Sequence, residues 1–177
     1  NHKTMLIDAG NAADGDTVVE YIKKENISRI DYLVATHPHE DHIGGMADVV
    51  STFDIGSVFM SDTISTTKTF ENLLSAIENK KLKITATEAG KIVIDDNNLS
   101  VKFIAPVTKI DDLNNMSLVI NITYGQNTIL LMGDAEKESE NLILSSGQAV
   151  KADVLKIGHH GSDTSSSTSF LEAVSPK

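Results

Sequence analysis

The sequence contains no cysteine among its 177 residues. Disulfide bonds and thiolate metal sites are therefore excluded, and a metal ion in this protein would be held by imidazole and carboxylate groups. The absence carries no information about the cellular compartment, because bacterial proteins on either side of a membrane can do without cysteine.

Long apolar runs and an excess of basic charge are also missing. No stretch approaches the roughly 18 to 20 apolar residues that cross a bilayer, and the first ten residues lack the pattern of a signal peptide. We therefore expect no membrane contact by this chain itself. With 15 Lys and Arg against 25 Asp and Glu, the net charge of −10 gives no general attraction to nucleic-acid backbones, so any such role must be local to a site.

The residues that are present alternate between strand-like apolar runs and helical patterns. Apolar spacing predicts helices over 15–27 (with Asp16 as its cap), 44–53, 66–81, 136–146 and 165–175. Strands are predicted at 4–10, 30–36, 57–61 and 152–158, with antiparallel hairpins at 91–106 and 117–134. The mixture predicts one α/β domain, residues 1–177, in which helices cover sheets.

The segment THPHEDHIGG, residues 36–45, follows the strand predicted at 30–36 and concentrates titratable groups. In extended geometry His37 and His39 project to the same side, while Asp41 and His42 follow a turn and can face a second point nearby. Imidazole and carboxylate groups in this pattern are typical of divalent metal sites, and two ions could share the loop. We interpret Glu40, between these ligands, as a solvated loop residue.

Two later segments have the same form, a buried strand that runs into a polar loop. Asp134 ends one of them, in LLMGDAE, and the pair His159 and His160 ends the other, in LKIGHHGS. Five of the six histidines thus fall in two motifs, which leaves only His2 outside them. Loops at one end of a rigid sheet are the expected place for catalytic groups. By contrast, we interpret the aspartates of DDNN, residues 95–98, as a plain hairpin turn.

These motifs resemble the metallo-β-lactamase superfamily. HPHEDH at 37–42 matches its HxHxDH motif. DAG at 8–10, MGD at 132–134 and a histidine of the pair His159 and His160 match its other motifs in the same order. More narrowly, THPHEDHIGG, NNMSLVI at 114–120 and LKIGHHGSDTSSS resemble the C-terminal domain of ComEC-like competence proteins and their free-standing relatives. The resemblance implies an αββα sandwich with two metal ions, a metal-bound hydroxide as nucleophile, and a place outside a bacterial cell, with the cytoplasm as the alternative.

The resemblance also has departures. Members with two full zinc sites usually carry a further histidine between the first motif and the bridging aspartate. This sequence has no histidine from Ile43 to Gly158. The first site would therefore consist of His37, His39 and Asp134, completed by water, Asn115 or Ser117. The second would consist of Asp41, His42, Asp134 and His160. Zinc is the expected metal, and manganese is the alternative. Relatives continue beyond a segment like AVSPK, so we expect a truncated C-terminus that lacks part of the second sheet's cover.

The resemblance and the metal chemistry together suggest roles for single residues. Asp41 would bind a metal and also orient the nucleophile, whereas His159 would contact the substrate or the ligands. The backbone of Gly161, the hydroxyl of Ser162 and the N–H groups of 165–167 are candidate donors to an anionic substrate, with simple helix capping as the equal alternative for the serines.

Three classes of function stay open. A metal-dependent phosphodiesterase or nuclease, acting on DNA, a nucleotide or a phosphorylated cell-surface component, is favoured by the ComEC-like motifs. A hydrolase of carboxylic substrates, such as a lactam, a lactone or a thioester, is the alternative. A non-catalytic binding module is the third class, and the intact set of ligands argues against it. Substrate identity and oligomeric state cannot be read from the sequence.

Overall fold

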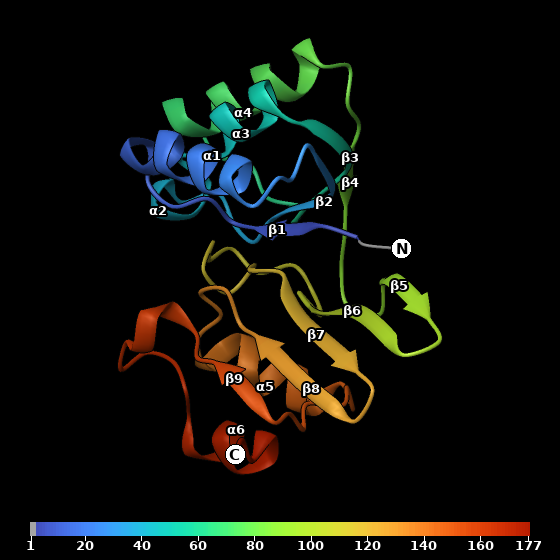
Figure 1. Cartoon of the computed structure of the whole chain (residues 1–177). Coiled ribbons are helices and arrows are strands. Elements are labelled where there is room, and N and C mark those ends of the chain that lie inside the picture. Colours follow the sequence, from blue (N-terminus) through green and yellow to red (C-terminus); the bar gives the residue numbers. More distant parts are fainter. Residues whose placement is uncertain (1–2) are drawn as a thin grey trace. The chain divides into compact units, whose positions relative to one another are not determined.

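A computed structural model describes residues 3–177 and divides the chain into two compact units. One unit ends at Ala86, and the other comprises Thr87–Lys177. Each unit has its own sheet (Figure 1), of four strands in the first and five in the second. Each also has its own hydrophobic core. That residues 1–177 act as a single domain stays a prediction.

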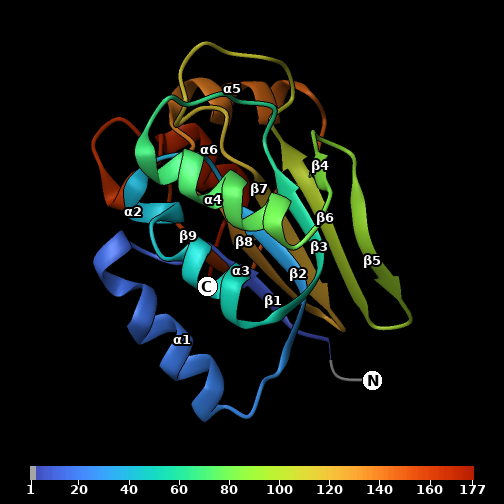
Figure 2. The ribbon, with the colours of Figure 1, turned by 90° about the horizontal axis from the view of Figure 1, so that it is seen from above.

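The sheet of the first unit is parallel throughout, in the order β1-β2-β3-β4. Its strands are β1 (Met5–Ile7), β2 (Arg29–Ala35), β3 (Asp54–Met60) and β4 (Ile84–Ala86). The helices that follow them are η1 (Ala12–Asp14), α1 (Gly15–Lys24), α2 (Glu40–Ile43), α3 (Met46–Thr52) and α4 (Lys68–Asn79). Parallel strands need such crossover connections, and Figure 2 shows α3 between α1 and α4.

The helices α1, α3 and α4 bury their apolar residues against this sheet. Val19 and Ile22 of α1, and Phe70, Leu73 and Ile77 of α4, lie in one core with the apolar strand residues, as their helical spacing predicts. Thr67 caps α4 by accepting a hydrogen bond from the Phe70 N–H.

One local expectation for the first unit was wrong, and one strand was not predicted. Asp16 is not the cap of α1: the N-cap position belongs to Asp14, and Asp16 lies in the first turn. β4 was not predicted, because its three residues are all exposed and show no pattern of buried apolar positions.

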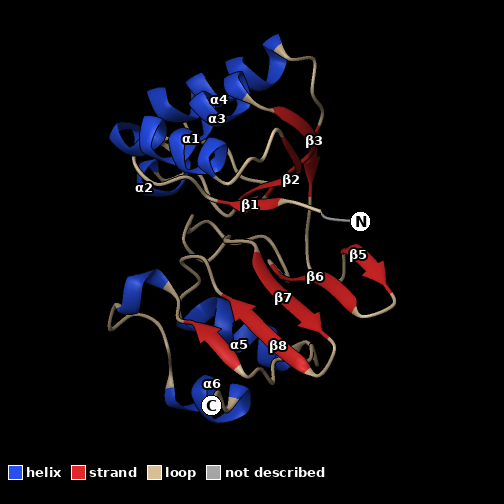
Figure 3. Cartoon of the chain, viewed as in Figure 1, coloured by secondary structure: helices blue, strands red, loops and turns tan. Residues whose placement is uncertain are grey.

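The sheet of the second unit is antiparallel except at one edge, where β8 and β9 are parallel. Its strands are β5 (Ile92–Asp96), β6 (Leu99–Ala105), β7 (Val119–Tyr124), β8 (Asn127–Leu131) and β9 (Val154–Lys156). Both predicted hairpins, β5-β6 and β7-β8, are confirmed (Figure 3). The first turn is made by Asn97 and Asn98, whereas Asp95 and Asp96 end β5.

Two helices pack on this second sheet and complete its core. They are α5 (Lys137–Ser145) and α6 (Thr168–Val174), and a short turn, η2 (His159–Gly161), lies between β9 and α6. Ile143 of α5 and Phe170 and Val174 of α6 are buried together with residues of β6, β7 and β8. Among the helices of residues 3–177, none has the length and apolar character required to span a bilayer.

Candidate functional site

The segment 36–45 leaves β2 in extended form and then turns into the short helix α2. His39 is the N-cap of α2, and Asp41 and His42 lie within the helix. Glu40 is exposed, as we expected, but it is the first residue of α2 rather than a loop residue, and its Oε1 accepts a hydrogen bond of 2.7 Å from the Ala12 N–H. This contact fixes the loop after β1 against α2.

The structure brings His37 and His39 together, as their spacing predicts. Nε2 of His37 lies 3.0 Å from Nδ1 of His39, and the two rings meet edge to face. His37 is 1% exposed, and its Nδ1 lies 3.1 Å from the hydroxyl of Thr36. Two imidazole nitrogens of neighbouring residues thus face one another at the end of β2.

His42 is held by an aspartate from the loop after β1. Its Nδ1 lies 2.7 Å from Oδ2 of Asp8, which also accepts a hydrogen bond from the Thr36 hydroxyl, while Oδ1 accepts one from the Thr36 N–H. A carboxylate on Nδ1 fixes the ring and leaves Nε2 for another ligand. That Nε2 lies 3.6 Å from Oδ2 of Asp41. Asp8 reaches Thr36 and His42 from a left-handed backbone, with φ of +59°.

Gly44 lets the loop after β1 approach α2 closely. A Cβ at this position would lie 2.1 Å from the backbone nitrogen of Ala12 and 2.3 Å from the carbonyl carbon of Asn11, which no side chain tolerates. Gly44 therefore allows the segment that carries the candidate ligands to pack directly against the backbone of the loop after β1.

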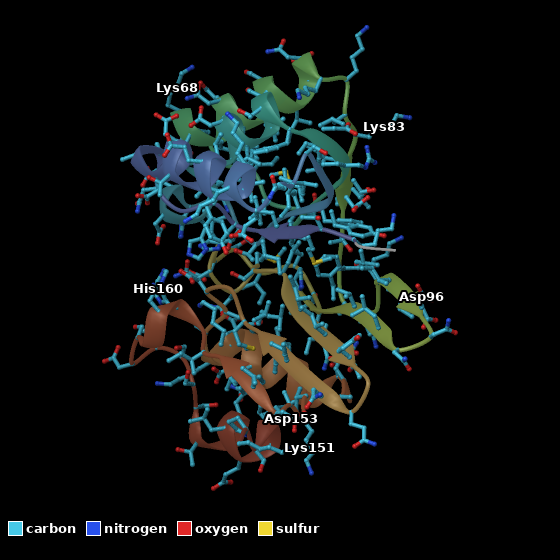
Figure 4. All side chains as sticks on the ribbon, viewed as in Figure 1. Lys68, Lys83, Asp96, Lys151, Asp153 and His160 are labelled. Atoms are coloured by element: carbon cyan, nitrogen blue, oxygen red, sulfur yellow. The ribbon has the colours of Figure 1, made fainter. Side chains whose placement is uncertain are left out.

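In the second unit, Asp134 follows β8 and is nearly fully buried. Its backbone N–H donates to the hydroxyl of Ser117 at 3.0 Å, and its Oδ2 lies 3.3 Å from Nε2 of His160. The side chain of His160 is exposed, at the surface position labelled in Figure 4. Of the two consecutive histidines, His160 is the one that faces Asp134.

His159 turns instead toward Glu136. Its Nδ1 lies 2.6 Å from Oε1 of Glu136 and 3.2 Å from the hydroxyl of Thr164. The backbone makes this divergence, because His159 and His160 have φ of +42° and +51°. Such left-handed residues cost of the order of 1–3 kcal/mol each, and they occur preferentially at functional sites.

The loop around the histidine pair is held by its own backbone and by one close approach. Gly161 N–H donates to the Gly158 carbonyl and Ser162 N–H to the His159 carbonyl, while the Ser165 hydroxyl donates to the Gly158 carbonyl. A Cβ on Gly158 would lie 2.0 Å from the Ala135 carbonyl oxygen. The Gly161 N–H is therefore already used and does not point to a substrate.

The serine-rich segment has a structural role. The N–H groups of Ser166 and Ser167 donate to the buried carboxylate of Glu140, and Ser167 caps α6. Of the two alternatives for 165–167, the structure supports helix capping, because these donors are occupied. The side chain of Asn115 is likewise engaged, since its Oδ1 accepts hydrogen bonds from the N–H groups of Glu136 and Ser139.

Several residues around the candidate ligands were missed as site residues. Asp8 belonged only to a matching motif, and Thr36, Glu136 and Thr164 were given no role. For Glu136 the available signal was its place two residues after Asp134 in MGDAE, a carboxylate next to a candidate ligand. His2 lies outside the described residues.

The comparisons with known proteins agree with these motifs. The sequence model described as the metallo-beta-lactamase superfamily matches residues 1–177. ComE operon protein 3 of Bacillus subtilis (strain 168) is 28% identical over 164 residues, which are 90% of this chain and 21% of that protein. Competence protein ComA of Neisseria gonorrhoeae is 29% identical over 180 residues, 99% of this chain and 23% of that protein. The chain thus spans about a fifth of the length of these relatives.

A solved structure shows the fold. A metallo-β-lactamase-type protein of Thermotoga maritima superposes with a TM-score of 0.59 at 18% sequence identity, over 88% of this chain and 81% of that one. The resemblance to ComEC-like proteins and the α/β fold class, with two sheets flanked by helices, are both confirmed. The chain belongs to the metallo-β-lactamase superfamily, whose members are generally metal-dependent hydrolases.

Proposed function

We propose that the chain is a metal-dependent phosphoesterase that cleaves phosphodiester bonds of DNA or of a nucleotide. The observation that carries the proposal is that each unit holds an imidazole Nε2 and a carboxylate oxygen side by side. These pairs are His42 with Asp41, at 3.6 Å, and His160 with Asp134, at 3.3 Å.

The proposed ligands of one ion are Asp41 and His42 of the first unit with Asp134 and His160 of the second. Each of the four offers a donor atom of the kind that divalent metals take. A second, weaker set would be His37 and His39, with Asp134 shared between the two ions. It lacks a fourth protein ligand, so we expect it to lose metal first.

The spacing of donor atoms within each unit fits such ions. Two ligand atoms at about 2.0–2.1 Å from a tetrahedral zinc are roughly 3.3 Å apart. The separations of 3.0 Å between His37 and His39, and of 3.3 Å between Asp134 and His160, are close to this value. Asp8 on His42 supplies the outer carboxylate that orients a metal-bound histidine. All these donors are nitrogen or oxygen, so zinc and manganese both suit them.

When bound, the divalent metals would supply an activated water and polarise the phosphoryl oxygen. Among the chain's own groups, the half-exposed carboxylate of Asp41 would accept a hydrogen bond from the attacking water and so align it with phosphorus. His159, which does not face Asp134, would contact the substrate. Buried Asp134 and the buried ring of His42 would hold their positions through Ser117 and Asp8.

The DNA part of the proposal is supported by the resemblance to ComEC-like proteins and by a relative that is named a competence protein. The net charge of −10 opposes binding along a long polyanion. A short end, a single strand or a mononucleotide derivative at the metal ions is therefore the substrate form that the charge favours.

Metal content gives the first test. After dialysis against zinc or manganese, elemental analysis should find about two ions per wild-type chain, one of them removed by mild chelation. In His42→Ala the tightly held ion should be lost while circular dichroism stays that of a folded protein. A folded wild-type sample that retains no metal would refute the ligand assignment.

Activity gives the second test. The metal-loaded chain should hydrolyse bis(p-nitrophenyl) phosphate but not a chromogenic lactam, and Asp41→Asn should lower the rate by several orders of magnitude while the fold is kept. Asp16→Asn, an exposed aspartate of α1, is the matched control. Phosphodiester hydrolysis that is unchanged in Asp41→Asn would refute the proposed phosphoesterase function. Hydrolysis of the lactam alone would show that the substrates are carboxylic compounds.

A further inference from the structure

Three residues from two segments of the chain contact the carboxylate of Glu136: His159 and Thr164 of the loop between β9 and α6, and Asn114 of the loop before β7. Oε1 lies 2.6 Å from Nδ1 of His159, accepts a hydrogen bond of 2.8 Å from the Thr164 hydroxyl, and accepts one of 3.3 Å from the Asn114 amide. All of these residues belong to the second unit. Glu136 is thus the point at which the histidine loop is joined to the loop after β8.

Helix capping does not explain this carboxylate. Glu136 occupies the N-cap position of α5, yet its side chain makes no capping hydrogen bond. The side chain of Asn115 does that work instead, by accepting from the N–H groups of Glu136 and Ser139. Because the helix start is satisfied by another residue, the Glu136 side chain is left to act on His159.

The contacts of His159 determine where its ring proton lies. An ionised carboxylate only accepts hydrogen bonds, and the single proton of the Thr164 hydroxyl has acceptors in Glu136 Oε1 at 2.8 Å and Ser162 Oγ at 3.0 Å, so that its oxygen can accept from Nδ1. Both neighbours of Nδ1 therefore favour a proton on Nδ1. Within the described residues, the His159 ring contacts both Glu136 and Thr164 through Nδ1, so Nε2 is the nitrogen left for a substrate.

The backbone adds a second constraint on the same ring. The left-handed φ angles of His159 and His160 turn two adjacent rings apart, with centroids 6.1 Å from each other. One ring faces Asp134 and the other faces Glu136. We infer that Glu136 is a positioning residue, which fixes the orientation and the tautomer of His159 so that its Nε2 is presented to the substrate. This inference rests on the proposed phosphoesterase function.

The positioning itself can be measured without metal or substrate. Long-range ¹H–¹⁵N spectra of the metal-free, histidine-labelled chain at about pH 8, above the ordinary histidine pKa, report the tautomer of each ring. The signals of His159 are assigned by their loss in His159→Ala. We expect an Nδ1–H tautomer in the wild type and a mixture of both tautomers in Glu136→Ala. Unchanged His159 signals in Glu136→Ala would overturn the inference.

Kinetics then separate positioning from a merely structural role. Glu136→Ala should lower kcat by about 10- to 100-fold at nearly constant KM, with metal content unchanged. Glu136→Gln, which retains an acceptor for Nδ1–H, should recover part of this loss. Glu138→Gln, an exposed glutamate of the same helix, is the matched control and should behave as wild type.

A double variant completes the test. If Glu136 acts through His159, adding Glu136→Ala to His159→Ala should cause no further loss of kcat, whereas independent losses that multiply would overturn the inference. Loss of metal in Glu136→Ala would do the same. The spectra decide the positioning even if the wild type hydrolyses no phosphodiester, and that inactivity would count against the proposed function alone.

Discussion

The two histidine loops are held in different ways. In the first unit, His37 and His42 are buried, and Asp8 and Thr36 of the same unit hold them. In the second unit, 32% of the His159 side chain and 55% of the His160 side chain are exposed, and both residues have a left-handed backbone. Carboxylates hold histidines in both loops, but the histidines His37 and His42 are buried, whereas His159 and His160 are partly exposed on a strained turn.

This difference predicts different consequences of mutation. A buried polar group that loses its partner destabilises the fold, because no water replaces the lost hydrogen bond. An exposed histidine that is removed leaves its neighbours in water, so the fold is kept and only metal binding or chemistry changes. Mutations in the first loop should therefore lower both stability and function. Mutations of the exposed histidines in the second loop should change function and leave stability nearly unchanged.

The largest effect is expected within the second loop, where two adjacent histidines should differ in kind. His160→Ala should abolish retention of the tighter ion and with it the activity. His159→Ala should retain metal and lose about 10²- to 10³-fold in rate, the scale of one transition-state hydrogen bond. Metal analysis and phosphodiester kinetics on both variants measure this difference. Equal loss of metal in the two variants would show that our assignment of roles within the pair is wrong.

The fold was largely predictable from the sequence, because apolar periodicity marks most of its elements. The two hairpins and the helices α1 and α4 follow from patterns such as Phe70, Leu73 and Ile77. β4 and α2 were not found, because a strand of three exposed residues and a helix of four carry too few buried side chains to show a period.

The candidate metal ligands could be predicted from their spacing in the sequence. The residues that hold these ligands in place could not. Asp8 reaches His42 across 34 positions, and Glu136 reaches Thr164 across 28. Such contacts depend on strand pairing and loop direction rather than on local sequence. The divergence of His159 and His160 likewise depends on two left-handed residues, which a sequence without glycine at those positions does not announce.

A smaller effect is expected at the supports of the two loops, and it should be unequal. Asp8→Ala removes the acceptor of the buried Thr36 N–H, so it should lower the free energy of unfolding by about 1–3 kcal/mol. Glu136→Ala leaves groups that water can reach, and it should cost less than about 1 kcal/mol. Urea unfolding of the metal-free variants measures both. Equal losses would remove the distinction between a buried and an exposed loop.

The smallest effect concerns two aspartates outside the loops, one in each unit. The N–H of Thr4, with Arg29 and Lys3, lowers the pKa of Asp31, and Lys177, with the N–H of Thr128, lowers the pKa of Asp153. A lowered pKa in the folded state means that the stabilisation is complete above the unfolded value of 3.8 and is lost as the pH falls from there through the folded pKa.

Each variant, Asp31→Asn and Asp153→Asn, should therefore make the free energy of unfolding fall less steeply below about pH 5, with little change of this slope near neutrality. The two effects should add, because the aspartates lie in different units and share no partner. Urea unfolding between about pH 3 and 6 measures the slope, with Asp96→Asn at the β5-β6 hairpin as the control (Figure 4). If both variants kept the wild-type slope, these ion pairs would contribute nothing to the acid sensitivity of either unit, and the contrast between the units would lie in the histidine loops alone.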